Sequence, residues 1–362
     1  IAEAELVTWT SMALGMTVAA VLSVPTLLFP EVIAGLFGLD AETTEQAAGF
    51  VFWLSIFNVF TAINMVLSTA LRATGDVITP LWFLLLSSLF NVSFGYLLAY
   101  GVGGLPALGV PGVGFGGGFA GALVSLFFAA FWWRGKFKLK PLKQARINRP
   151  MLRQLVTIGA PSVLEQGVIQ LAFLGFFAIV GQYGTAAYAA YGIGISLVSF
   201  SIVIGFGFSI AAATLVGQQI GAGDPDMATA AGWRGMRMAI AAMSFFSVLL
   251  ALYAQELAAF MIQDPETRRL TVLFIYLIAA VQPVMAIEIT LSGALRGAGD
   301  TRFPLIATIC GILFGRLLPA LLILTSGLSV TWIYAVMLLD YSIKSLMVLY
   351  RYRSGKWLPL RA

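Results

Sequence analysis

Ten long, continuous apolar runs constrain this chain more than any other feature of its sequence. Each holds about 20 or more mostly apolar residues, the length that an α-helix needs to cross the hydrocarbon core of a bilayer. Because apolar and polar residues do not alternate within them, the runs predict helices and not the strands of a membrane barrel. We expect ten spans, at residues 6–29, 46–70, 80–101, 112–133, 156–181, 187–215, 231–254, 270–294, 303–326 and 330–350.

The composition favours the same class, an all-α polytopic membrane protein. Apolar residues make up 60% of the chain and charged residues 10%, whereas soluble domains carry about 25% charged residues. A chain with so large a share of apolar residues is not expected to have nucleic acid as a partner, although its formal net charge is +5. The chain has no histidine and a single cysteine, Cys310, which excludes histidine-based zinc sites and Ser-His-Asp triads. We therefore expect no enzyme and no bound cofactor.

The Lys and Arg residues predict the orientation of these spans in a cell membrane. Most of them fall in connections on one side, above all in the segment 134–153 and the C-terminal tail, while the opposite side carries Arg268 and Arg269. The basic side faces the cytoplasm by the positive-inside rule. Both termini are therefore expected to be cytoplasmic.

Two parts of the chain are copies of each other. LSTALRATGDVITP at 67–80 and LSGALRGAGDTRFP at 291–304 are identical at eight of fourteen positions, at an offset of 224 residues. The same offset aligns further residues, namely Asp40, Glu42 and Thr43 with Asp264, Glu266 and Thr267, and Trp9 with Trp233. In each copy we expect a helix to end at the Arg, a left-handed turn at Gly75 or Gly299, and a Pro in the next helix's first turn.

The repeat and the charges together divide the chain. Both copied loops lie on the cytoplasmic side, so the copies are parallel repeats. We expect an N-terminal lobe with four spans at 1–133, a basic cytoplasmic linker at 134–153 and a C-terminal lobe with six spans at 154–362. Two spans of the second lobe then have no counterpart in the first. Our hypothesis is that the chain is an N-terminally truncated form of a twelve-span protein.

Three motifs resemble the MATE (multidrug and toxic compound extrusion) family. They are IGAPSVLEQ at 158–166, VGQQIGAGD at 216–224 and LSGALRGAGDTRFP at 291–304. The resemblance implies two helical lobes around a central cavity and a secondary antiporter that works by alternating access. Such a protein exports organic, often cationic and amphipathic compounds in exchange for Na⁺ or H⁺, and a monomer in the lipid bilayer suffices for it.

Ionisable residues inside spans are candidate functional residues, because a charge at a helix centre costs about 2.5–3.5 kcal/mol on insertion scales. Glu165 leads among them, since Pro161 frees a backbone carbonyl in the preceding turn. Ser162 shares the helical face of Glu165, and Gln166 and Gln170 form a neighbouring polar row. We expect Glu165 to exchange H⁺, Na⁺ and a cationic substrate. The family resemblance implies a cation-coupling glutamate at this position.

Glu288 is the second candidate, with functional and structural roles both open. The repeat aligns it with Asn64, and it aligns Gln282 with Asn58, so polar residues recur at two depths in both copies. All of Glu288, Gln282 and Asn64 are candidates to bind ion or substrate. One branch of the family carries an aspartate three residues before this glutamate, where this chain has Met285.

The last spans hold three further charges. Asp340 precedes Lys344 by one helical turn, which predicts an internal ion pair, and Asp340 is also a candidate site residue. Arg316 has no local partner and is expected to reach Glu288 or Asp340 on another helix.

Three alternative functions remain. A flippase of lipid-linked oligosaccharides or polysaccharides in the same superfamily would favour an arginine-rich cavity, whereas the candidates here are mainly carboxylates and amides. An intramembrane enzyme would need a nucleophile with its base, or a metal cluster. A chain that lacks half of one lobe could also be a fragment that does not transport.

Overall fold

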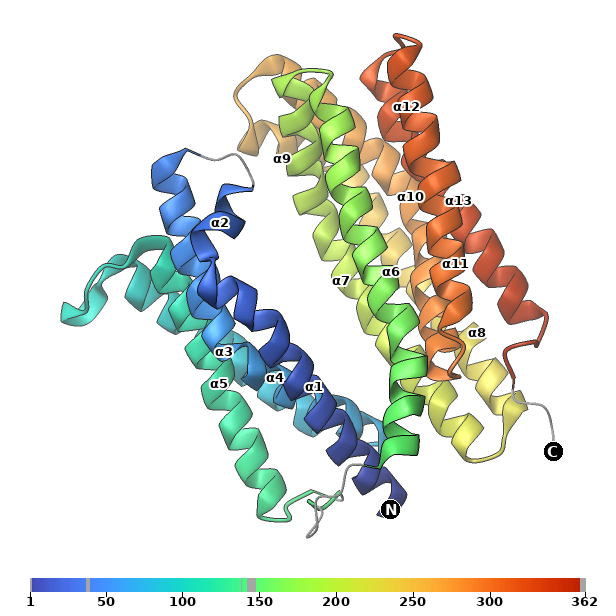
Figure 1. The fold of residues 1–362 in the computed structure, drawn as a ribbon. Coiled ribbons are helices and arrows are strands. Elements are labelled where there is room, and N and C mark those ends of the chain that lie inside the picture. Colours follow the sequence, from blue (N-terminus) through green and yellow to red (C-terminus); the bar gives the residue numbers. More distant parts are fainter. Residues whose placement is uncertain (1, 37–39, 138, 142–147, 359–362) are drawn as a thin grey trace. The chain divides into compact units, whose positions relative to one another are not determined.

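The computed structural model describes residues 2–36, 40–137, 139–141 and 148–358. Within these residues the elements are all helices (Figure 1). The described residues form ten helical spans that are long and apolar enough to cross a membrane, one of which, Arg302–Thr325, is a continuous run of three shorter helical elements. Each span contains one of the predicted runs or nearly coincides with it. The predicted all-α polytopic fold class is therefore confirmed.

The chain divides into two compact units, Ile1–Leu155 and Val156–Ala362. The helices of the first unit are α1 (Ala2–Leu28), the short α2 (Pro30–Gly35), α3 (Ala41–Ala73), α4 (Ile78–Tyr100), the 3-10 turn η1 (Val102–Gly104) and α5 (Gly109–Trp133). Helix α5 packs against α3 and α4, and α1 packs against α3. Glycines on α5 permit this approach: a Cβ on Gly116 would lie 2.6 Å from the backbone N of Gly95.

The second unit is organised around α10. Its helices are α6 (Arg149–Gly181), whose first residues belong to the first unit, α7 (Thr185–Gly221), α8 (Pro225–Leu252), α9 (Ala254–Met261), α10 (Pro265–Gly297), α11 (Arg302–Cys310), the π-helix η2 (Gly311–Leu317), α12 (Leu318–Thr325) and α13 (Val330–Arg353). Helix α10 packs against α7, α8 and α13. Gly293 and Gly297 bring it so close to α7 that a Cβ on either would collide with Ser209 or Ala213.

The predicted linker at 134–153 is partly helical. Helix α6 begins at Arg149, several residues before the apolar run, and the side chain of Asn148 accepts a hydrogen bond of 3.3 Å from the N–H of Met151. This cap lets a polar first turn extend the helix toward the basic segment. Residues 138 and 142–147 of the predicted linker lie outside the described residues.

Both copies of the repeat fold alike at their helix ends. Asp40 caps α3 and Asp264 caps α10, and each accepts a hydrogen bond from the N–H three residues later. Hydrogen bonds from Thr43 lower the pKa of Asp40, and those from Thr267 lower the pKa of Asp264. Gly75 and Gly299 have φ of +89° and +87°, as the sequence predicts. The repeat thus reproduces local geometry at equivalent positions.

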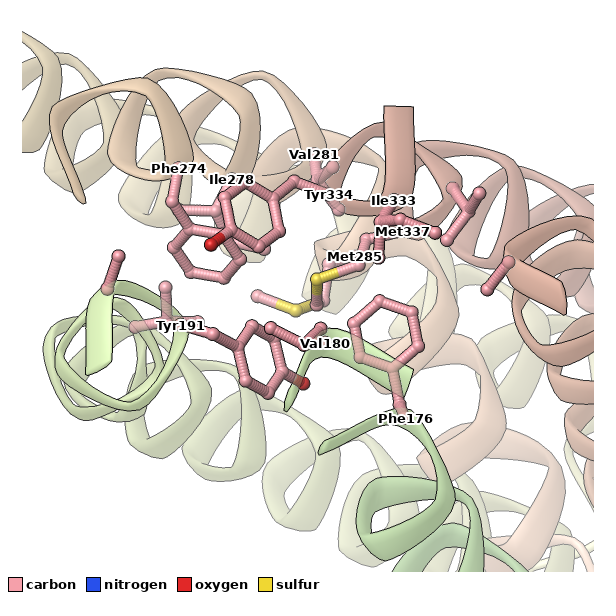
Figure 2. Close-up of a cluster of buried hydrophobic side chains, with 14 of the residues drawn as sticks. Phe176, Val180, Tyr191, Phe274, Ile278, Val281, Met285, Ile333, Tyr334 and Met337 are labelled. Carbon is pink, nitrogen blue, oxygen red and sulfur yellow. The ribbon is translucent and has the colours of Figure 1, made fainter. Parts of the chain in front are cut away.

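The core of the second unit is an apolar cluster that draws on five long helices, α6, α7, α8, α10 and α13. Figure 2 shows Phe176 and Val180 of α6, Tyr191 of α7, Phe274 and other residues of α10, and Tyr334 of α13 converging on one another. The hydroxyl of Tyr334 donates a hydrogen bond of 2.8 Å to the carbonyl of Ala187. This cluster holds α6 and α13 against the α7–α10 pair.

Candidate functional site

The second unit contains a cavity of about 440 Å³ between α6, α7, α10, α11, η2 and α13. Its apolar wall includes Val198, Ile278 and Met337, which also belong to the core cluster. Its polar lining consists of Glu165, Gln166, Gln170, Ser199, Glu288, Arg296, Thr308, Arg316, Tyr341 and Lys344. Because charges are costly within membrane-spanning helices, this concentration of them around one cavity marks the candidate site.

A larger hollow of about 680 Å³ lies in the first unit, and Glu31, Glu42 and Glu45 line it. These carboxylates are exposed. Water therefore satisfies them without any ligand, and the hollow carries no comparable indication of a site.

Glu165 is buried at the cavity wall, with 1% of its surface exposed. Arg296 of α10 donates from Nη2 to Oε1 at 2.8 Å and from Nε to Oε2 at 3.3 Å. Thr308 of α11 donates its hydroxyl to Oε1 at 3.0 Å. Three helices thus meet at one carboxylate. A two-point ion pair with an added hydrogen bond offsets much of the cost of burying that charge.

Sequence reasoning missed both partners of Glu165. Arg296 was expected only to end α10, and it does lie one residue before the helix end at Gly297. Its side chain also reaches back to α6, a contact across 131 residues of chain. Thr308 stands in an apolar run and gave no signal in the sequence. Arg296 could have been suspected, because it is a strong cation at the edge of a span that holds a second acid.

Glu288 lines the same cavity and is 9% exposed. Its carboxylate accepts a hydrogen bond of 3.3 Å from the hydroxyl of Ser292, one turn later. Among the nearby cations, Lys344 and Arg296 act on it electrostatically. No ion pair with Glu288 is found among the described residues. The cavity therefore presents a second carboxylate whose charge is not directly matched.

The first unit repeats the hydrogen bond of Glu288 at the equivalent position. Asn64 on α3 accepts from the hydroxyl of Ser68 at 3.1 Å. Both copies thus contain a hydrogen-bonded polar pair within one helix. The acceptor is a glutamate in the second copy and an asparagine in the first. The charge of Glu288 is a property of the second copy alone.

Asp340 forms the centre of a buried triad. Arg316 pairs with its Oδ2 through Nη2, and Lys344 places Nζ 2.9 Å from Oδ1. Both the predicted Asp340–Lys344 pair and one of the two predicted partners of Arg316 are confirmed. Arg316 and Lys344 line the cavity, but Asp340 is not among its described lining residues. The lining is thus richer in cations than the sequence analysis expected.

The remaining candidates lie in different surroundings. Gln166 and Gln170 line the cavity, as the polar row on α6 predicts. Ser162 is half-buried and is not among the described lining residues. Gln282 is completely buried on α10, and neither atom of its amide has a hydrogen-bond partner in the described part of the chain. Across the residues that the structure describes, no three His, Cys, Asp or Glu side chains converge as a metal site.

Comparison with known proteins finds a match to the MatE family model at residues 2–97 and 161–321. A probable multidrug resistance protein, NorM, of Thermotoga maritima is 28% identical over 96% of this chain and 75% of its own length. The NorM multidrug resistance protein of Burkholderia vietnamiensis is 31% identical over 61% of this chain and 49% of its own length.

A solved structure has the same fold at low sequence identity. It is a transporter of the MOP superfamily from Pyrococcus furiosus, described as having a binding pocket of reversed polarity that suggests a different function. The TM-score is 0.85 at 16% identity, over 97% of this chain and 83% of that one. At this identity the likeness shows the fold alone.

Proposed function

The chain belongs to the MatE family of transporters, and on that premise we propose that it exports organic, often cationic and amphipathic compounds as an antiporter driven by Na⁺ or H⁺. The names of its NorM relatives, which are multidrug resistance proteins, support export of drugs. The family consists of transporters and not of enzymes. We propose a small-molecule substrate within a lipid bilayer, no nucleic-acid partner and a monomer as the working unit.

One observation carries the coupling part of this proposal: the buried carboxylate of Glu165 at the wall of the cavity. In its present pairing Arg296 neutralises it. In a medium of low dielectric constant a carboxylate is stable only with a cation or a proton beside it. H⁺, Na⁺ and a cationic substrate are therefore alternatives to one another and to Arg296. If these cations compete for one carboxylate, the release of the substrate depends on the binding of H⁺ or Na⁺. Competition of this kind is the simplest form of coupling.

Glu288 extends this scheme within the same cavity. Its carboxylate has Ser292 as its hydrogen-bond donor and is free of a direct ion pair among the described residues. A cationic substrate would find its countercharge there, while the apolar wall takes up the rest of the molecule. Gln166 and Gln170 offer amide oxygens at the same cavity. Oxygen ligands of this kind suit Na⁺, with Glu165 supplying the charge.

The experiment that tests the proposal is transport by the purified chain in proteoliposomes. A fluorescent organic cation such as ethidium is followed while a Na⁺ gradient and a pH gradient are imposed separately, with the membrane potential clamped. We expect one of the two gradients to drive ethidium against its concentration. Equal ethidium movement with and without either gradient would contradict the proposed antiport.

The orientation is a separate proposal, with both termini in the cytoplasm. A cysteine is introduced at Lys140 after Cys310→Ser removes the native thiol. We expect an impermeant maleimide to label this cysteine only after the cells are permeabilised. A second cysteine at Arg269, on the opposite side, serves as the matched control and should label in intact cells. Labelling with the reverse pattern would invert the proposed topology.

A further inference from the structure

Arg316 holds an unusual position in the wall of the cavity. It is 7% exposed, and the rings of Phe176 and Tyr341 lie 5.8 Å and 5.7 Å from its guanidinium carbon. One end of the guanidinium pairs with Asp340, whereas Nε is buried and has no hydrogen-bond partner among the described residues. A buried N–H donor without a partner destabilises the folded state, because it has lost its hydrogen bonds to water. This donor belongs to a side chain that lines the cavity.

The backbone beneath Arg316 is packed closely against α13. Arg316 lies on the π-helix η2, where Gly311 and Gly315 face α13. A Cβ on Gly315 would lie 2.6 Å from Cα of Asp340, and one on Gly311 would lie 2.7 Å from its Oδ1. The two helices are therefore packed backbone against backbone at the ion pair. Arg316 thus extends from a closely packed stretch of backbone, and its Nε donor has no partner among the described residues.

The charges around the cavity leave this wall positive. Asp340 is one carboxylate shared by two cations, Arg316 and Lys344. Glu165 is already matched by Arg296. One positive charge near Tyr341 is therefore in excess, and Glu288 is the unpaired acid that acts on Lys344 through space. The cavity thus has an acidic pole at Glu288 and a basic pole at Arg316 and Lys344.

We propose that Arg316 and Lys344 form a subsite for an anionic group, the carboxylate or sulfonate of an amphipathic organic compound. Nε of Arg316 donates to that group, and Lys344 adds its charge and its unused N–H donors. The volume of about 440 Å³ and the apolar wall accommodate a fused ring system beside the anion. The inference deepens the proposed function by naming a second substrate class, and it rests on that function only in treating this cavity as a substrate site.

Binding to the purified protein in detergent tests the subsite. Three probes share one ring system: 9-anthracenecarboxylate, its neutral carboxamide, and 9-(aminomethyl)anthracene as the cation. Equilibrium dialysis measures each probe against protein-free micelles. We expect the carboxylate to bind about tenfold more tightly than the carboxamide, the effect of one charge-assisted hydrogen bond. Equal binding of the two would overturn the proposal.

Two variants assign the effect to named residues. Glu288→Gln removes the like charge from the cavity, so the carboxylate should bind several-fold more tightly and the cationic probe more weakly. Misfolding would change the binding of all three probes in the same direction, so a gain for the carboxylate with a loss for the cation assigns the effect to charge. A carboxylate affinity that stays the same or falls would count against the subsite. Arg316→Lys keeps a charge opposite Asp340 but lacks Nε, so the preference for carboxylate over carboxamide should fall to about twofold or less. An unchanged preference in that variant would refute the role of Arg316.

The binding test and the transport test fail independently. Selective carboxylate binding without gradient-driven export would preserve the subsite and remove the antiport proposal. Export of ethidium without carboxylate selectivity would preserve the antiport proposal and remove the subsite.

Discussion

Replacement of Glu165 by Gln is expected to abolish ion-driven efflux while the protein stays folded. Gln has nearly the same shape, and its amide oxygen can still accept hydrogen bonds from Arg296 and Thr308. It cannot carry the charge that H⁺, Na⁺ or a cationic substrate neutralises. Without this charge the ion gradient has no group on which to act, so gradient-driven movement of ethidium should fall to the rate of protein-free liposomes. The loss of efflux is measured as the initial rate of ethidium movement in proteoliposomes.

Thr308→Val is the matched control for this variant. It removes one hydrogen bond from the same carboxylate and leaves the charge and Arg296 in place. We therefore expect a smaller loss, of less than about tenfold. Melting temperatures close to the wild type would show that both variants are folded. Wild-type efflux by a folded Glu165→Gln protein would eliminate Glu165 as the coupling group.

Replacement of Asp340 by Asn is expected to be the most destabilising single change in the second unit. The side chains of Arg316 and Lys344 are 8% and 7% exposed, so both cations would stay buried without their shared carboxylate. Removal of one partner from a buried ion pair typically costs roughly 3–5 kcal/mol. Thermal unfolding in detergent, followed by circular dichroism, measures the effect.

Lys344→Met is the control for the buried triad. It removes one of two cations and leaves Arg316 and Asp340 as a one-to-one pair, while methionine retains much of the side-chain volume. We expect a clearly smaller loss of stability than in Asp340→Asn. Equal unfolding temperatures for the two variants would show that the triad does not depend on its carboxylate.

The candidate site divides into parts that the sequence predicts and parts that it does not. Glu165 and Glu288 are recognisable because a carboxylate stands out in an apolar run, whatever the run packs against. For Arg316, sequence reasoning left two possible partners, Glu288 and Asp340, and could not choose between them. Thr308 gave no signal, because a threonine hydroxyl in a span is usually satisfied within its own helix.

The π-helix η2 is a feature of the backbone that the sequence does not predict. The segment GILFGRL has no proline and its residues other than Arg316 continue an apolar run, so it predicts an ordinary helix. Its widened turn accompanies the close contact of Gly311 and Gly315 with α13. That contact depends on α13, which begins at Val330, well after η2 in the chain.

The amino-acid sequence by itself determined the ten spans, the repeat that aligns Asp40 with Asp264, and the left-handed turns at Gly75 and Gly299. The spans follow from hydrophobic length, and the turns from hydrogen bonds between neighbours in the chain. Tertiary structure alone decided that Arg296 meets Glu165 and that Arg316 lines the cavity with an unused donor. Such pairings depend on which helix faces pack together, and a charge buried among helices takes whichever partner that packing brings within reach.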